Sequence, residues 1–128
     1  MINLSIVIPC YNESKSLPRL FLTCINAAKG RNDIEFIFVN NGSNDETQIV
    51  LDQLFSQDNY TFGKSVHVPI NKGYGFGILQ GLAVAEGRIL SWTHADLQTD
   101  PKDVVFAYEL YKVELESNRC IVKGERKG

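Results

Sequence analysis

Two short apolar runs constrain the fold of this 128-residue chain more than any other feature. Residues 4–8 (LSIVI) and 34–39 (IEFIFV) are rich in branched and aromatic side chains. A nearly continuous apolar run of this length is typical of a strand that is covered on both faces of a sheet. Each run ends in a polar cluster and is followed by apolar residues at helical spacing. The pattern predicts parallel strands that are joined by helices.

Local end signals predict where the first two helices begin. The first has Ser16 as its N-cap and Pro18 in its first turn, and Gly30 is expected to end it. Ser43 and Glu46 have the spacing of a capping box, in which each side chain bonds the backbone N–H of the other. A second helix is therefore expected to begin at these residues.

The next two helices have different kinds of start. The glycine-rich residues 71–77 lead into the third helix, and apolar positions between residues 78 and 85 carry it to Gly87. Asp100 as N-cap and Pro101 at the first helical position mark the start of the fourth.

Three further strands complete the pattern. Residues 88–92 form a short apolar run, and residues 120–122 indicate a fifth strand. Residues 66–70 contain Pro69, which places this strand at an edge or makes the proline a strand end. The order βαβαβαβαβ predicts an α/β fold with a Rossmann-like, mainly parallel sheet and helices on both faces. Residues 1–128 are expected to form a single domain.

Charge and composition exclude several classes of function. The net charge is −2 and no basic run precedes residues 123–127, so nothing indicates nucleic-acid binding. No segment approaches the roughly 18 apolar residues that span a bilayer, and residues 1–5 lack the features of a signal peptide. Cys10, Cys24 and Cys120 are odd in number and widely spaced. This argues against a disulfide framework or a zinc cluster, and for reduced thiols in the cytoplasm.

Polar side chains with ligand-binding chemistry follow each of the first four predicted strands. In an open parallel sheet the carboxyl ends of the strands lie along one edge, where ligands bind in a crevice. The candidates are, in chain order, Tyr11, Glu13, Asn40, Asn41, Lys72, Gly73, Asp96 and Gln98. Carboxylates bind divalent cations, which in turn bind substrate phosphates. We therefore expect a nucleoside-diphosphate site with Mg²⁺ or Mn²⁺, held mainly by Asp96, at this edge.

Each candidate also has a structural interpretation when it is taken alone. Tyr11 is alternatively a surface residue, and Glu13 a residue at the start of a helix. Asn40 and Asn41 belong to a sequence with good turn chemistry, and Asp96 is alternatively a turn residue. The convergence of four loops, rather than any single residue, favours a ligand site.

Two histidines and one tryptophan are less specific. His94 fits a metal ligand, a general base or a loop residue. His67 lies on a predicted strand and is expected to be structural, and Trp92 is expected in the core.

The glycine spacing excludes two nucleotide-binding motifs. The glycines of residues 73–77 are two apart, whereas a G-x-G-x-x-G fingerprint needs glycine where Ile78 or Gln80 stands. No G-K-[ST] sequence of a P-loop follows. The glycines are expected either to let the backbone turn and the helix pack closely, or to contact a ligand together with Lys72.

Four motifs together resemble those of the family 2 glycosyltransferases. They are residues 6–13 (IVIPCYNE), 39–47 (VNNGSNDET), 71–87 (NKG to AEG) and 95–101 (ADLQTDP). These enzymes have the GT-A fold. The Asp-Leu-Gln-x-x-Pro form is most similar to the branch related to dolichol-phosphate mannose synthase, which glycosylates polyprenyl phosphates.

The resemblance implies roles for the first two loops. Pro9, Tyr11 and Glu13 would hold the nucleoside, and Asn41, with Asn40, would contact the base. The family usually has Asp-Asp where this chain has Asn40 and Asn41. Asparagine keeps an acceptor oxygen but loses the charge, so we expect base recognition to be altered.

The resemblance also implies roles for the later loops. Lys72 and Gly73 would line the nucleotide pocket. Asp96 would be the main metal ligand of the family's D-x-D motif, with Gln98 assisting. His94 replaces the first Asp of that motif. Imidazole binds Mn²⁺ but suits Mg²⁺ poorly.

The function that the resemblance implies is metal-dependent, inverting glycosyl transfer in cell-wall or polysaccharide biosynthesis. The partners would be a nucleoside-diphosphate sugar and a polyprenyl phosphate or glycan acceptor, with no nucleic acid. Residues 124–126 resemble the G-x-R that ends the nucleotide-binding half. We therefore expect either a longer parent protein, in which the acceptor half, the catalytic base and any membrane-associating helices follow Gly128, or a short natural variant. Its expected location is the cytoplasm, at the cytoplasmic face of the membrane in the full-length protein.

Two other functions compete with this interpretation. The first is a binding module that keeps the fold but has lost its chemistry, which His94 and the Asn40–Asn41 pair favour. The second is a nucleotidyltransferase, but that would need a glycine-rich, basic loop directly after the first strand. Residues 9–12 (PCYN) are not such a loop.

Overall fold

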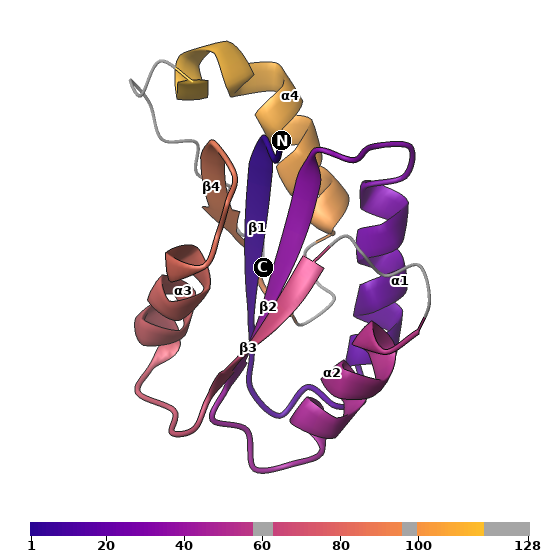
Figure 1. The fold of residues 1–128 in the computed structure, drawn as a ribbon, viewed down its shortest axis with the longest axis vertical. Coiled ribbons are helices and arrows are strands. Elements are labelled where there is room, and N and C mark those ends of the chain that lie inside the picture. Colours follow the sequence, from indigo (N-terminus) through magenta and orange to yellow (C-terminus); the bar gives the residue numbers. More distant parts are fainter. Residues whose placement is uncertain (58–62, 96–99, 117–128) are drawn as a thin grey trace, which may run out of the picture.

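Four parallel strands form the sheet at the centre of the molecule (Figure 1). The computed structural model describes residues 1–57, 63–95 and 100–116. The strands are β1 (Leu4–Cys10), β2 (Ile34–Asn41), β3 (Gly63–Val68) and β4 (Ile89–Trp92), in the spatial order β3-β2-β1-β4. The helices are α1 (Leu17–Ala27), α2 (Thr47–Phe55), α3 (Tyr74–Ala83) and α4 (Pro101–Glu116). The predicted α/β architecture is confirmed, and the expected strand at residues 120–122 lies outside the described residues.

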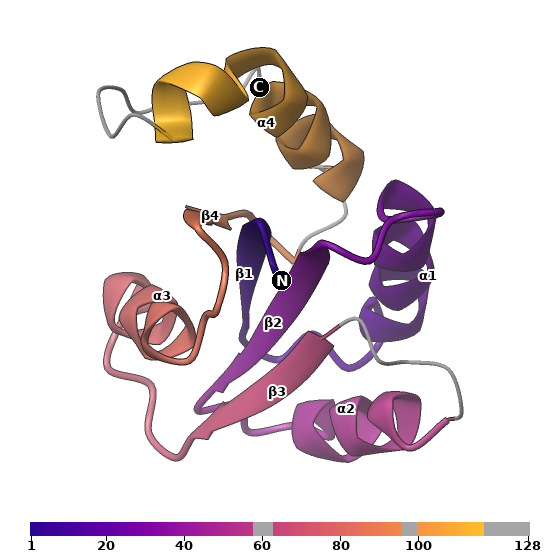
Figure 2. The same ribbon diagram turned by 45° about the horizontal axis from the view of Figure 1, so that its top comes forward.

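Helices cover both faces of the sheet, as predicted. Figure 2 shows α3 on one side of the sheet, with α1 and α2 on the other side. The fourth helix, α4, contacts α1 and β4. Side chains alternate between the two faces along each strand, so neighbouring residues enter different cores. Ile6 and Ile8 join the larger core with α1, α2 and α4, whereas Val7 packs in a smaller core beneath α3.

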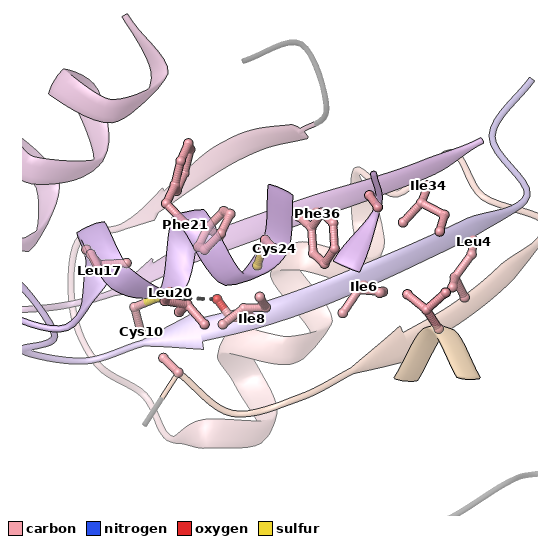
Figure 3. Close-up of a cluster of buried hydrophobic side chains, with 14 of the residues drawn as sticks. Leu4, Ile6, Ile8, Cys10, Leu17, Leu20, Phe21, Cys24, Ile34 and Phe36 are labelled. Atoms are coloured by element: carbon pink, nitrogen blue, oxygen red, sulfur yellow. Dashed lines mark hydrogen bonds between the residues drawn. The ribbon is translucent and has the colours of Figure 1, made fainter. Parts of the chain in front are cut away.

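The larger core is built around aromatic and branched side chains (Figure 3). The Phe21 ring of α1 lies 5.1 Å from the Phe38 ring of β2 and 4.9 Å from the Phe55 ring of α2, measured between centroids. Phe21 and Phe38 are fully buried. The aromatic cluster therefore joins both helices to the sheet, as expected for two central strands that are covered on both faces.

Close packing of α3 depends on glycine. A Cβ atom at Gly81 would lie 2.4 Å from Cγ1 of Val7 and 2.9 Å from Cγ2 of Val39. The absence of a side chain lets the helix axis approach the sheet. Packing thus stabilises a helix that contains glycines of poor intrinsic propensity.

This packing explains why the predicted limits of the third helix are wrong. The helix was expected to begin near residue 78 and to reach Gly87, but α3 spans Tyr74–Ala83. Its first turn includes Gly75 and Gly77, which the sequence pattern assigned to the preceding loop. Gly87 instead donates its backbone N–H to Ser5 Oγ at 2.8 Å, beside the start of β4.

Two of the three predicted N-caps do not cap with their side chains. Ser43 does not start α2, because its Oγ accepts a hydrogen bond from the backbone of Asn12 at 3.0 Å. Asp45 accepts from the Thr47 N–H at 2.9 Å in its place. Ser16 is at the N-cap position of α1, but its hydroxyl donates to a Glu13 carboxylate oxygen at 2.8 Å.

The predicted start of α4 is confirmed. Asp100 Oδ1 accepts a hydrogen bond from the Lys102 N–H at 2.9 Å, and Pro101 is the first helical residue. The helix thus has one of its free N–H groups satisfied by a carboxylate at the positive end of its dipole.

Edge strands account for two further outcomes. β3 lies at one edge of the described sheet and ends at Val68, so Pro69 follows the strand, as its missing N–H requires. The predicted limits, residues 66–70, are shifted to Gly63–Val68. The prediction that Trp92 is in the core is wrong: β4 forms the other edge, and this side chain is 53% exposed.

No helix in the described part of the chain is both long and apolar enough to cross a membrane.

Candidate functional site

The carboxyl ends of β1, β2 and β3 are level with one another. Cys10 pairs with Asn40, and Asn41 pairs with Val68. The loops that follow these strands therefore leave the sheet at one edge, which the sequence predicted. Pro9, also buried in β1, pairs with Val39 one step before this edge.

The loops after β1 and β2 are joined by reciprocal hydrogen bonds. The Asn12 N–H donates to Ser43 Oγ at 3.0 Å, and the Asn44 N–H donates to Asn12 Oδ1 at 2.8 Å. Asn12 adopts a positive φ of 53°, a conformation that asparagine tolerates better than most residues. The Glu13 N–H donates to Thr47 Oγ1 at 3.0 Å. The two loops thus form one unit.

Asp45 strengthens this unit electrostatically. Burial alone would raise the pKa of its carboxyl group, but hydrogen bonds from Thr47 and Ser14 outweigh that effect and lower the pKa. The Ser14 hydroxyl donates to Asp45 Oδ2 at 2.9 Å. The Asp45 carboxylate therefore has a structural role, because it accepts hydrogen bonds from both the loop after β1 and the start of α2.

The two residues predicted to hold the nucleoside have different exposure. Tyr11 is 44% exposed, and its hydroxyl accepts a hydrogen bond from Asn44 Nδ2 at 3.4 Å. Its ring is available for stacking at the sheet edge. The carboxylate of Glu13 is half-buried and accepts from Ser16.

Asn40 and Asn41 are both buried, with 2% and 3% of their surface exposed. Asn40 Nδ2 donates to Gln48 Oε1 at 3.0 Å, and Asn40 Oδ1 accepts from the Ser43 N–H at 3.2 Å. This side chain closes the turn after β2, which is the structural interpretation of the Asn-Asn-Gly-Ser sequence.

Asn41 connects β2 to the start of α3. Its Nδ2 donates to the Gly73 carbonyl oxygen at 3.1 Å. A Cβ atom at Gly77 would lie 2.9 Å from the Asn41 amide, so this glycine makes room for the asparagine. The buried Oδ1 of Asn41 has no hydrogen-bond partner among the described residues. It is a buried acceptor without a partner in the described part of the chain, a feature that is uncommon in folded proteins.

The glycine-rich segment is held in an extended turn. Gly73 has φ 106° and ψ 162°, and its N–H donates to Asn71 Oδ1 at 2.8 Å. Gly42 touches the backbone of Asn71, because a Cβ atom there would lie 2.2 Å from its nitrogen. Lys72 is exposed, with its Nζ 5.3 Å from the centre of the Phe76 ring.

His94 follows β4 and contacts the first residue of α3. Its Nδ1 lies 3.1 Å from Tyr74 Oη, and the two rings stack with their centroids 5.4 Å apart and their planes inclined by 15°. Tyr74 is not among the site residues predicted from the sequence. The only signal for it was its position directly after Lys72 and Gly73.

The remaining predicted metal ligands, Asp96 and Gln98, lie outside the described residues. Within the described ranges no three His, Cys, Asp or Glu side chains form a metal-binding group. A donor set with an imidazole nitrogen from His94 and oxygens from Asp96 and Gln98, as the sequence predicts, would suit Mn²⁺ better than Mg²⁺. His94 is compatible with that set, because its contact with Tyr74 uses Nδ1 and a metal would bind the other ring nitrogen, Nε2.

A separate cavity of about 350 Å³ opens at the opposite, amino edge of the sheet. Its charged side chains are paired: Lys64 Nζ lies 3.4 Å from a carboxylate oxygen of Glu35 and 3.4 Å from one of Glu86. The buried Glu35 also accepts from Ser5 Oγ at 2.6 Å. None of the predicted site residues lines this cavity.

The family model described as glycosyl transferase family 2 matches residues 5–112. The chain belongs to this family. The undecaprenyl-phosphate 4-deoxy-4-formamido-L-arabinose transferase of Proteus mirabilis is 33% identical over an alignment of 104 positions, which covers 78% of this chain and 31% of that protein. The dolichyl-phosphate beta-glucosyltransferase ALG5A of Trichomonas vaginalis is 31% identical over an alignment of 131 positions, gaps included, which covers 96% of this chain and 40% of the relative.

A solved structure shares the fold of this chain. The mannosyltransferase PcManGT from Pyrobaculum calidifontis, in complex with GDP-Man and Mn²⁺, superposes with a TM-score of 0.68 at 20% identity. The match covers 73% of this chain and 27% of that one. The chain therefore has the GT-A fold, and it spans less than half the length of the relatives that it matches.

Proposed function

We propose that this chain is the donor-binding part of an inverting, metal-dependent glycosyltransferase. The observation that carries the proposal is that the loops after β1, β2 and β3 leave the sheet at one edge, in a member of glycosyl transferase family 2. Residues 1–128 would act as a single domain, with the nucleoside diphosphate at the carboxyl ends of the strands.

The residues in the first loops would bind the nucleoside. The half-exposed ring of Tyr11 would stack on the base, while Pro9 and Glu13 would shape the wall of the pocket. Asn40 would hold the loop after β2. Asn41 would contact the base through Oδ1, the oxygen without a partner among the described residues.

The later loops would bind the diphosphate. Lys72 is exposed and cationic, and Gly73 leaves its backbone open to close approach by a phosphate. Asp96 would hold a divalent metal, with Gln98 and His94 assisting. When bound, the metal would neutralise charge that develops on the departing nucleoside diphosphate.

A polyprenyl phosphate is the proposed acceptor. The names of the two curated relatives include undecaprenyl phosphate and dolichyl phosphate. The acceptor oxygen would attack the anomeric carbon from the face opposite the diphosphate and invert its configuration. Such an acceptor would place the full-length protein at the cytoplasmic face of a membrane, in cell-wall or polysaccharide biosynthesis.

Calorimetry with GDP- and UDP-sugars tests the proposal. Binding should require Mn²⁺, and Asp96→Ala should abolish the metal-dependent part. Asp52→Ala, on the exposed surface of α2, is the matched control and should bind normally. Unchanged binding by Asp96→Ala would refute the metal assignment.

A second candidate is a binding module without catalytic activity. It is favoured by His94 and by Asn41, which replace carboxylates of the family pattern, and by the engagement of both asparagine amide groups with the protein itself. Turnover assays on the full-length gene product separate the candidates, since only an enzyme transfers sugar to a lipid phosphate.

A further inference from the structure

The contact between Tyr74 and His94 joins two segments that lead to the proposed metal site. Tyr74 is the first residue of α3, and His94 is the second residue after β4. The 3.1 Å separation of Tyr74 Oη and His94 Nδ1 is a hydrogen-bond distance, and the stacked rings keep the imidazole plane aligned with the phenol.

Both residues are held by their surroundings. The Thr93 N–H donates to the Val7 carbonyl oxygen at 2.9 Å, and both Thr93 and Ala95 are buried, which anchors the backbone on either side of His94. Gly73, directly before Tyr74, accepts from Asn41. The imidazole is therefore presented in one orientation before any ligand binds.

The contact leaves a single ring nitrogen for a ligand. A neutral imidazole has one N–H donor and one acceptor nitrogen, and a neighbouring group selects which is which. A histidine that binds a metal through one nitrogen usually donates the other N–H to an oxygen. A tyrosine hydroxyl oxygen can accept that bond.

We propose that Tyr74 is a positioning residue that makes His94 a metal ligand. Tyr74 Oη accepts the Nδ1–H of His94, so Nε2 carries the lone pair that coordinates a divalent cation. This inference rests on the proposed function, and it explains how an imidazole serves where the family pattern has a carboxylate. Tyr74 and His94 then act as one unit, in which neither side chain is sufficient alone.

The opposite proton arrangement gives a different site. If the tyrosine O–H donates to Nδ1, then Nε2 carries the proton and is a hydrogen-bond donor toward a phosphate oxygen. A spectroscopic measurement distinguishes the two arrangements, because only the first joins a nitrogen nucleus to the metal.

The test uses Mn²⁺ as the probe, titrated into the chain in the presence of GDP or UDP. Free Mn²⁺ is followed by electron paramagnetic resonance, and electron spin-echo modulation reports ¹⁴N coupling to bound Mn²⁺. We expect ¹⁴N coupling in the unaltered chain and its loss in His94→Asp. Tyr74→Phe keeps the stacking ring and removes the hydroxyl, and it should weaken Mn²⁺ binding about 10-fold or more.

A double-variant comparison gives the decisive control. In the His94→Asp background, Tyr74→Phe should leave the Mn²⁺ affinity unchanged. A carboxylate has no tautomers, so it does not need the tyrosine hydroxyl to select one. Tyr111→Phe, at a tyrosine of nearly equal exposure on α4, should leave Mn²⁺ affinity unchanged.

Each outcome has a defined meaning. Mn²⁺ binding without ¹⁴N coupling, or with equal affinity in Tyr74→Phe, overturns the inference and leaves the proposed function intact. No binding of Mn²⁺ with either nucleotide overturns the proposed function and the inference together. If His94→Asp fails to fold, the comparison of Tyr74→Phe with the unaltered chain still decides.

Discussion

The side-chain amide of Asn41 donates a hydrogen bond to the backbone carbonyl of Gly73 across 32 positions of sequence. The bond joins the end of β2 to the start of α3 inside the protein. A carboxylate at position 41 could not donate this bond. The replacement of the family's aspartate by asparagine therefore changes the connection between two loops, in addition to the charge of the site.

Asn41→Asp should destabilise the fold and weaken nucleotide binding. The change removes a buried donor and places an ionised oxygen near a carbonyl oxygen, which should lower the free energy of unfolding by about 1–3 kcal/mol. Urea denaturation gives the stability change. Asn44→Asp, an exposed position in the same loop, should alter stability by less than about 0.5 kcal/mol. An Asn41→Asp variant as stable as the unaltered chain would contradict the role given to this bond.

Two glycines of α3 should respond to alanine in opposite directions. Gly81→Ala introduces a methyl group against Val7 and Val39 and should lower the unfolding free energy by about 1–3 kcal/mol. Gly75→Ala meets no atom within 4 Å and should stabilise the helix by up to about 1 kcal/mol. Thermal melting of both variants measures the difference. Equal melting temperatures would mean that α3 does not require the close approach.

The free energy of unfolding should depend on the protonation of Asp33 at acidic pH. The hydrogen bond from Arg31 lowers the pKa of Asp33 from its ordinary 3.8 to about 2. Because the folded-state pKa is the lower one, the stabilisation is complete above about pH 4 and is lost as the pH falls from 4 to 2. Asp33→Asn should remove about 1–2 kcal/mol at neutral pH and flatten the pH dependence in that window.

Urea denaturation at several pH values checks this prediction. Asp52→Asn, at an exposed carboxylate of α2, should keep the full acid dependence. The assignment fails if Asp33→Asn loses as much stability between pH 4 and pH 2 as the unaltered chain.

The two described cysteines should be unreactive in the folded protein. Burial raises the pKa of both Cys10 and Cys24 far above the ordinary thiol range, so almost no thiolate forms at neutral pH. In a Cys120→Ser variant, which leaves only these two thiols, a maleimide should label neither in native buffer and both in guanidinium. Mass spectrometry counts the labels, and rapid native labelling would contradict the burial.

The two central strands, β1 and β2, were predictable because burial on both faces of the sheet requires a nearly continuous apolar run. Residues in β1 and β2 are buried without exception, so their apolar runs could hardly indicate anything else. The start of α4 was predictable for a local reason, since Asp100 and Pro101 act on their own helix.

The parts that were not predictable depend on contacts between distant residues. The glycines in the first turn of α3 look like loop residues until Asn41 is seen to fill the space beside Gly77. Ser43 looks like an N-cap, but a different loop uses its hydroxyl. The Tyr74–His94 contact has no local sequence pattern, because the two residues are 20 positions apart and only the fold brings α3 next to the end of β4. The loops after β1, β2 and β3 leave one edge of the sheet as expected, whereas ligand contact by the predicted site residues stays a prediction.

The central position of β1 has a consequence for synthesis on the ribosome. Leu4 pairs with Ile34 on one side and with Ile89 on the other, so β1 has both its neighbours only after β4, the last of the described strands, has been made. Until β4 has emerged, one edge of β1 keeps unpaired N–H and C=O groups. An open strand edge is a template for pairing with other chains. The nascent polypeptide is therefore most prone to aggregation after β2 has emerged and before β4 does, which is when a chaperone at this edge would protect it.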